Sequence, residues 1–205
     1  MRPYTTCTGT GVPLLQANLD TDVIMPKQFL KGIDRQGLAR GLFYDLRYDA
    51  SGVEQADFVL NQPEYRNASF LVVGPNFGCG SSREHAVWGL LQYGIRALIG
   101  TGFASIFRDN CFNNGLLPIA LPADLHARIA TLCARPPRNL LTVDLVSQTV
   151  TLSDHSRLPF RIDDMYRENL LHGRDAIAAT LRYSAEIAAF EDRHWNRSPW
   201  LKPGT

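Results

Sequence analysis

Cysteine is scarce in this chain, and its four residues stand too far apart along the sequence to form a ligand set. They are Cys7, Cys79, Cys111 and Cys133, with no CxxC pair among them. Small disulfide frameworks and self-contained zinc or iron–sulfur sites draw their cysteines from close spacings. We therefore expect that this chain itself binds no metal and no cofactor.

An excess of charge of either sign is also missing. The 21 lysine and arginine residues balance 20 aspartate and glutamate residues, so the net charge of +1 offers no basic field for nucleic acid or anionic lipid. No apolar run reaches the length of about 18 residues that suggests a membrane span, and the first residues do not read as a signal peptide. We expect a cytoplasmic protein that binds neither nucleic acid nor a membrane.

The length and the hydrophobic content are those of one globular unit. A chain of 205 residues with 45% hydrophobic residues can bury one full core. We expect a single domain over residues 1–205, with a C-terminal helical extension at about 163–195.

The middle of the chain alternates strand patterns with helix patterns. Apolar strands are predicted over 69–73, 95–100 and 116–121, separated by helices over 81–93 and 103–114 that end at Gly94 and Gly115. Such strand–helix–strand units imply parallel strands. A hairpin is predicted within 139–152 around Ser147 and Gln148, and an amphipathic helix over 175–195. The fold class is therefore α/β, with a mixed parallel and antiparallel sheet.

The N-terminal third has weaker patterns. Residues 13–26 predict a loop that leads into a short strand at Val23 to Met25. Residues 27–48 are interrupted by glycines, which favours a mobile loop over a long helix. Residues 56–67 predict a short helix or strand broken at Pro63.

Glycine and serine gather at Gly78 to Arg83, just where a helix is expected to begin. One interpretation is structural: Ser81 or Ser82 caps the helix and Glu84 completes the cap. The other is an anion site, in which helix-end amides and the guanidinium of Arg83 hold a carboxylate or phosphate. The sequence lacks GxxxxGK[ST] and the GxSxG elbow, which argues against nucleotide binding and against a serine hydrolase.

Three runs of sequence resemble one known family. The run from Gly74 to Ile119 (GPNFGCGSSREHAVWGLLQYGIRALIGTGFASIFRDNCFNNGLLPI) resembles the swivelling domain of the aconitase superfamily, and NLDTDVIMPKQFL (Asn18 to Leu30) resembles the N-terminal signature of that domain. The later LLHGRDAIAATLRYSAEIAAFE resembles the small subunit of bacterial isopropylmalate isomerases. The resemblance covers nearly the whole chain and implies a β/β/α swivelling domain with flanking helices.

The resemblance also implies an activity that needs a second chain. Members of the family are hydro-lyases that isomerise 2-isopropylmalate and 3-isopropylmalate by dehydration and rehydration in leucine biosynthesis. In that family a larger subunit binds a [4Fe–4S] cluster through three cysteines. The resemblance therefore implies a heterodimer with a large cluster-bearing subunit, and a small hydroxy diacid as substrate.

Roles for individual residues follow from the same resemblance. Ser81 occupies the position of the general base that removes the carbon-bound proton of the substrate, while Gly80, Ser82 and Arg83 help to hold a carboxylate. Glu84 and His85, one turn into the helix, are not expected to be catalytic. The trio Asp20, Thr21 and Asp22 is expected to organise a neighbouring loop.

The segment Lys31 to Gly37 corresponds to the family's mobile loop that faces the substrate's side chain. Leu30 and Ile33 could meet an isopropyl group, and Arg35 a carboxylate; a solvated basic loop is the alternative interpretation. Two other functions stay open. One is the small subunit of a hydro-lyase for homoaconitate, citraconate or another maleate-type diacid, and the other is a non-catalytic assembly subunit that binds a carboxylate.

Overall fold

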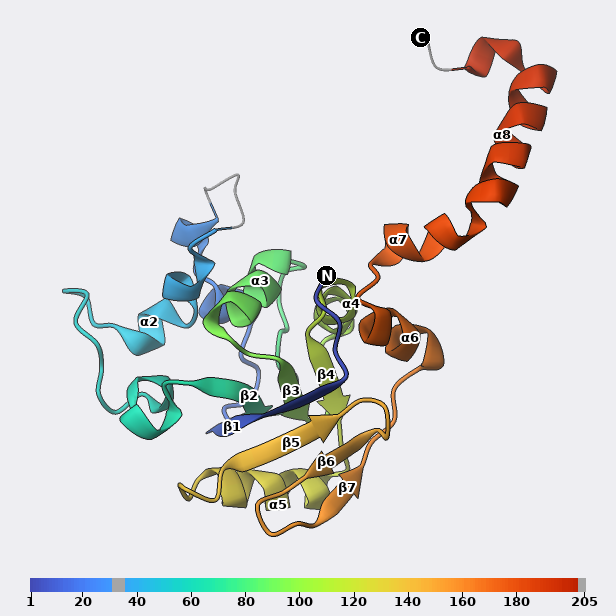
Figure 1. Ribbon diagram of the computed structural model, residues 1–205. Coiled ribbons are helices and arrows are strands. Elements are labelled where there is room, and N and C mark those ends of the chain that lie inside the picture. Colours follow the sequence, from blue (N-terminus) through green and yellow to red (C-terminus); the bar gives the residue numbers. More distant parts are fainter. Residues whose placement is uncertain (31–35, 203–205) are drawn as a thin grey trace.

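One mixed sheet organises the residues that the computed structural model describes, 1–30 and 36–202. The strand order is β4-β3-β2-β1-β5-β6-β7 (Figure 1). The parallel half consists of β1 (Thr6–Leu14), β2 (Ala68–Val73), β3 (Ala97–Gly100) and β4 (Leu117–Ala120). The antiparallel half consists of β5 (Leu140–Asp144), β6 (Thr149–Thr151) and β7 (Arg157–Pro159). The predicted mixed sheet and the predicted hairpin are confirmed.

Strand β2 shows why the parallel half needs a cover on both faces. Its residues alternate between two cores: Leu71 and Val73 belong to one hydrophobic cluster, and Phe70 and Val72 to the other. All four are 0% exposed. A parallel strand buried on both faces has a continuous apolar sequence, which is why SFLVV is easily recognised as a strand.

Helices cover the two faces of the sheet unequally (Figure 1). On one face lie α3 (Glu84–Tyr93) and α4 (Ser105–Asn114), which pack against each other, together with the short α1 (Thr21–Ile24) and α2 (Tyr44–Arg47). On the other face lies α5 (Ala123–Cys133), which contacts β1 and β2. Helices α3 and α4 end at Gly94 and Gly115, both with positive φ, as the sequence predicts.

The strand predicted at Val23 to Met25 is wrong, because residues 21–24 form the helix α1. The cause is a cap: the carboxylate of Asp20 accepts hydrogen bonds from the amides of Asp22 (2.9 Å) and Val23 (2.8 Å). Around α1 and α2 the described residues form four short 3₁₀ turns, which are η1 (Lys27–Phe29), η2 (Leu38–Gly41), η3 (Val59–Asn61) and η4 (Pro63–Tyr65).

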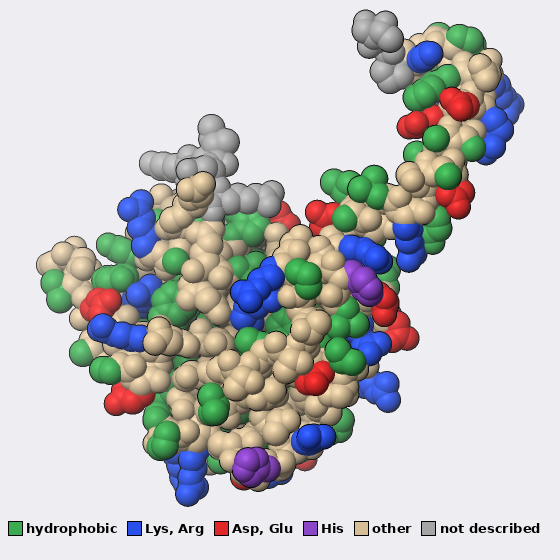
Figure 2. Space-filling model, in the orientation of Figure 1, with side chains coloured by type: hydrophobic (Ala, Val, Ile, Leu, Met, Phe, Trp, Pro, Cys, Tyr) green, Lys and Arg blue, Asp and Glu red, His purple; other side chains and the backbone are tan. Residues whose placement is uncertain are grey.

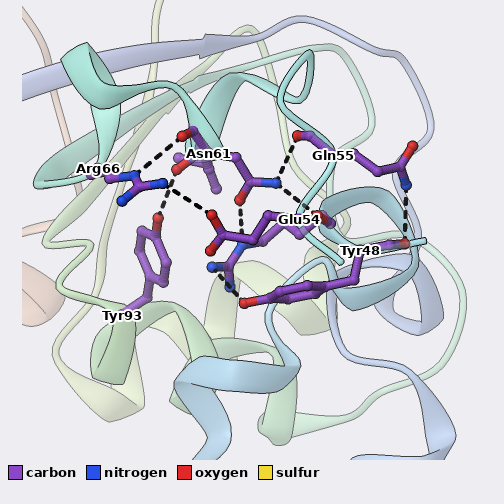
Figure 3. A network of polar contacts seen from close by, with 8 residues as sticks. Tyr48, Glu54, Gln55, Asn61, Arg66 and Tyr93 are labelled. Carbon is purple, nitrogen blue, oxygen red and sulfur yellow. Dashed lines mark hydrogen bonds and ion pairs between the residues drawn. The ribbon is translucent and has the colours of Figure 1, made fainter. Parts of the chain in front are cut away.

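A polar network fastens the connection between α2 and β2 to the body of the protein (Figure 3). At its centre the guanidinium of Arg47, 7% exposed, donates to the side chain of Asn61 (3.2 Å) and to the hydroxyl of Tyr48 (3.2 Å). Arg47 also lies over the rings of Tyr48 and Tyr93, at 5.0 and 5.1 Å from the ring centroids. Because Tyr93 is the last residue of α3, this network ties the irregular segment to the helix that follows the serine loop.

The C-terminal residues 175–202 extend away from the body of the molecule and form an arm. After α6 (Asp164–His172), whose Leu170 is buried, come α7 (Ala176–Thr180), η5 (Leu181–Tyr183), α8 (Ser184–Arg197) and η6 (Pro199–Leu201). The continuous helix predicted over 175–195 is thus interrupted by a 3₁₀ turn. The arm stands clear of the domain in Figures 1 and 2, and neither α7 nor α8 has a buried residue. Within the described ranges, no helix combines the length and apolarity needed to cross a membrane.

Candidate active site

Two segments that are far apart in sequence meet at the end of β2. The amide of Gly78 donates to the carbonyl of Leu19 (2.8 Å), and the amide of Thr21 donates to the carbonyl of Cys79 (2.9 Å). Asp20 and Cys79 consequently form a strand-like parallel bridge. This pairing places the beginning of α1 directly against the glycine–serine loop that precedes α3.

The two glycines of this loop are required by its geometry. Gly78 and Gly80 have φ of +76° and +85°, a backbone region that other residues rarely adopt. A Cβ on Gly78 would overlap the ring of Phe107, and one on Gly80 would lie 3.3 Å from the Cβ of Asp20. Gly78 therefore allows close packing against Phe107, and the exposed Gly80 leaves its backbone uncovered by a side chain.

Ser81 and Ser82 lie in the loop and not at the cap of α3. The helix begins at Glu84, and Arg83 occupies the cap position without any side-chain cap hydrogen bond. The structural interpretation, in which a serine caps the helix and Glu84 completes the cap, is therefore wrong. Both serines are exposed, just before the N-terminal turn of a ten-residue helix, where helix amides favour an anion.

The hydroxyl of Ser81 has a buried partner. The Oγ atoms of Ser81 and Thr21 are 3.1 Å apart, and the Thr21 hydroxyl also donates to the carbonyl of Ser81 at 2.9 Å. Thr21 is 1% exposed. The sequence assigns Thr21 only to a neighbouring loop, whereas the structure brings its hydroxyl into direct contact with the predicted base.

Arg83 forms an ion pair with Asp22 of α1. The atoms that meet, Nη1 of Arg83 and Oδ1 of Asp22, are both shielded from solvent, while the Arg83 side chain as a whole is 25% exposed. Lys27 lies 3.8 Å from the other carboxylate oxygen of Asp22. One edge of the guanidinium is thus fixed by protein, and a planar guanidinium has further N–H donors for a ligand.

Helix α4 supports the loop and the first turn of α3. Asn110 donates to the carbonyl of Ser82 (3.4 Å), and Asn114 donates to the carboxylate of Glu84 (3.1 Å). Trp88 in turn donates from its indole nitrogen to Asn114 (2.9 Å). Glu84 therefore links two helices. His85 is half-buried and packs on the ring of Trp88, with centroids 4.7 Å apart.

The structure places the other predicted substrate-binding residues only in part. Leu30 is half-buried, directly follows η1 and packs against the core on the α3 face. Ile33 and Arg35 fall outside the described residues, as does most of the segment Lys31 to Gly37. Gly80, Ser81, Ser82 and Arg83 do form one continuous patch before α3, next to Asp22, which the sequence reasoning assigned to loop structure alone.

A metal cluster needs several ligand side chains gathered in one place. Among the described residues there is no group of three or more His, Cys, Asp or Glu side chains able to hold a metal ion. Cys79 is half-buried, with its sulfur 3.5 Å from the carbonyl of Asn18. Burial raises the pKa of Cys133 to about 12 and that of Cys111 well above the ordinary thiol value, so both remain neutral thiols within the core.

Two family models match the chain. Residues 1–124 match the aconitase C-terminal domain family, and residues 177–204 match the family of the C-terminal domain of the 3-isopropylmalate dehydratase small subunit. The first match contains both segments of the site, Leu19 to Asp22 and Gly78 to Arg83. The second match covers most of the arm.

Named relatives are similar over nearly their full length. The chain is 52% identical over 202 residues to the 3-isopropylmalate dehydratase small subunit 1 of Mannheimia succiniciproducens, covering 98% of this chain and 100% of that one. It is 49% identical over 203 residues to the 3-isopropylmalate dehydratase small subunit of Caulobacter vibrioides, with the same coverage. The solved structure of 3-isopropylmalate dehydratase from Methanocaldococcus jannaschii matches with a TM-score of 0.63 at 23% identity, over 91% of this chain and 99% of that one, and shows that the fold is shared.

Proposed function

The chain belongs to the family of 3-isopropylmalate dehydratase small subunits, within the aconitase superfamily, and from this premise we propose how its residues take part in the reaction. The activity is that of a hydro-lyase that interconverts 2-isopropylmalate and 3-isopropylmalate in leucine biosynthesis. The observation that supports the proposal most is the 52% identity over 98% of the chain. The loop Gly78 to Arg83 is then this chain's contribution to the active site.

Ser81 is the proposed general base. Its alkoxide takes the carbon-bound proton of the substrate, and the electron pair left behind forms the double bond as hydroxide leaves the neighbouring carbon. Rehydration in the opposite sense adds hydroxide to the first carbon and returns the proton from Ser81 to the second. The exposed position of Ser81 in front of α3 allows a diacid to reach its hydroxyl.

A serine hydroxyl needs a strongly lowered pKa for this role, and each unit corresponds to about 1.4 kcal/mol of preferential stabilisation of the alkoxide. Arg83 and the N-terminal amides of α3 supply positive potential beside Ser81. Their effect grows once a partner protein excludes water from the loop.

The carboxylate of the substrate is held by Gly80, Ser82 and Arg83 in this proposal. The Asp22 ion pair fixes Nη1 of Arg83, so the guanidinium is oriented before the substrate arrives. Leu30, Ile33 and Arg35 are proposed to meet the part of the substrate that distinguishes isopropylmalate from related diacids. We also propose that the protein is cytoplasmic, because its substrate is an intermediate of amino-acid biosynthesis in that compartment.

A larger partner completes the enzyme. The relatives are named as small subunits, which implies a large one. We propose a heterodimer in which the [4Fe–4S] cluster, a Lewis acid for the departing hydroxyl, is bound by the large subunit. This chain supplies the base and part of the carboxylate site.

Reconstitution with a cluster-bearing large subunit tests the proposal. The purified chain and the large subunit are assayed separately and together, on 2-isopropylmalate, homoaconitate, citraconate and maleate. We expect turnover only of the mixture, with isopropylmalate preferred. If the mixture prefers another diacid, that diacid replaces isopropylmalate as the proposed substrate. If the two subunits form a stable complex without activity, an assembly role is favoured.

A further inference from the structure

Thr21 presents a buried hydroxyl to the proposed base from a separate element of the fold. It is the first residue of α1, it is 1% exposed, and its Oγ1 lies 3.1 Å from the Oγ of Ser81. The same oxygen lies 2.9 Å from the carbonyl oxygen of Ser81. One side chain therefore contacts both the main chain and the side chain of one residue.

The number of protons determines the direction of these two hydrogen bonds. A carbonyl oxygen only accepts, so the single hydroxyl proton of Thr21 is donated to the carbonyl of Ser81. The contact between the two hydroxyls is then made by the Ser81 proton, donated to Thr21. In the neutral state Thr21 thus turns the Ser81 proton toward the buried side and leaves serine lone pairs toward the exposed side.

The geometry points to Thr21 as a positioning residue for Ser81, an inference that rests on the proposed role of Ser81 as base. When Ser81 gives up its proton to solvent, the Thr21 hydroxyl rotates from the carbonyl to the alkoxide and donates a charge-assisted hydrogen bond to it. A hydrogen bond to a charged acceptor is stronger than one to a neutral carbonyl, so the Thr21 hydroxyl favours the alkoxide of Ser81 over the neutral serine. Thr21 keeps its own proton throughout.

Thr21 is held in place from three directions. Its amide donates to the carbonyl of Cys79 (2.9 Å), its carbonyl accepts from the amide of Met25 (2.9 Å), and the preceding residue Asp20 caps α1. These contacts fix the main chain of Thr21 without using its hydroxyl. A substitution that removes only the hydroxyl therefore leaves its surroundings assembled.

Among the described residues, the titratable and charged groups along the segments packed here are Asp20 and Asp22 at α1, Lys27 in η1, and Cys79, Arg83, Glu84 and His85 in the loop and the first turn of α3. They are the same in a Thr21→Val variant. A change in the pH profile of that variant thus reports on Ser81 and its lost hydrogen bond.

The test compares Thr21→Val, Thr21→Ser and Thr8→Val in the complex with the large subunit. Thr8 is a matched control, because its hydroxyl lies 2.8 Å from that of Thr142 at an exposed site on β1. We expect Thr21→Val to lower kcat by about 10- to 100-fold, the equivalent of about 1.4–2.7 kcal/mol, and to move the acid limb of the kcat profile up by at least about one pH unit, with KM little changed. Thr21→Ser and Thr8→Val should stay close to wild type.

Two outcomes separate the inference from the function on which it rests. If Ser81→Ala is inactive while Thr21→Val keeps wild-type kcat and an unmoved acid limb, the positioning role is overturned. If Ser81→Ala itself keeps wild-type activity, the proposed base is overturned instead. Should Thr21→Val fail to assemble, Thr21→Ser and Thr21→Ala replace it, since they differ from each other only by the hydroxyl.

Discussion

Ser81, Ser82 and Arg83, the polar residues of the loop before α3, each contact a different neighbour, and these contacts together hold the loop in place. The Ser81 hydroxyl meets Thr21, and Arg83 meets Asp22, both on α1. The carbonyl of Ser82 meets Asn110 on α4. The loop is consequently held at both ends while Ser81 and Ser82 remain exposed. A rigid loop that presents exposed hydroxyls is suited to a step in which a proton moves over a short distance.

Ser81→Ala is expected to reduce turnover far more than stability. The serine is exposed and does not cap α3, so losing its side-chain contact with Thr21 should cost no more than about 1 kcal/mol. Loss of the proton acceptor should lower kcat by at least about 10² to 10⁴-fold. Steady-state kinetics of the reconstituted enzyme and thermal unfolding of the variant measure the two effects. Turnover within tenfold of wild type would place the base elsewhere.

Arg83→Lys is expected to show the opposite kinetic pattern. Lysine keeps the charge and can still pair with Asp22, but it loses the planar, bidentate grip on a carboxylate. KM for isopropylmalate should therefore rise several-fold with a smaller change in kcat. Asp22→Asn serves as the companion variant, because it frees the guanidinium without shortening it. A fall in kcat at unchanged KM would show that Arg83 acts on the transition state only.

At the scale of elements, the sequence predicted the βαβ core from local patterns, but it did not predict features that depend on contacts between distant segments. Strand β2 and helices α3 and α4 were predicted because their apolar runs and terminal glycines are local signals. Strand β1 was missed, since its TCTGTGVPL contains few apolar residues and its place in the sheet depends on β2 and β5. The pairing of Thr21 with Ser81 was missed for a similar reason, because 60 positions separate them.

The loop Lys31 to Gly37 carries the prediction on specificity. Replacing it with the corresponding loop of a homoaconitase-type subunit should shift the ratio of kcat/KM between diacids more than it changes stability, because the proposal places its residues against the part of the substrate that differs between diacids. The assay is the diacid panel with the reconstituted enzyme, and thermal unfolding is the control. Unchanged selectivity with activity retained would remove Ile33 and Arg35 from the proposed site.

The arm is expected to be dispensable for the fold. A chain that ends at Arg174 lacks α7 and α8, neither of which has a buried residue, and keeps α6 with its buried Leu170. Its free energy of unfolding should stay within about 1 kcal/mol of wild type. A chain that ends at Phe160 is the contrasting case and should be clearly less stable. A large loss already at Arg174 would mean that the arm packs on the domain.

Considered as a whole, the molecule has two hydrophobic cores separated by one sheet, and each core contains a buried thiol. Cys111 of α4 belongs to the core beneath α3, and Cys133 of α5 belongs to the core on the opposite face. Both are 0% exposed. Neutral thiols are compatible with these cores and thiolates are not, so the protonation of both residues is linked to folding.

This linkage predicts that the protein loses stability in alkali. Burial raises the pKa of Cys133 to about 12 and that of Cys111 well above its ordinary value, so above about pH 8.5 the unfolded chain releases thiol protons that the folded chain retains. The stability from each thiol is complete well below that pH and falls as the pH rises, by about 2 kcal/mol per thiol between pH 8 and pH 10. Urea unfolding at pH 8, 9 and 10 measures the slope, and Cys133→Ala should be less stable at pH 8 but should lose less on going to pH 10. An identical slope in Cys133→Ala and wild type would show that this thiol does not titrate with unfolding.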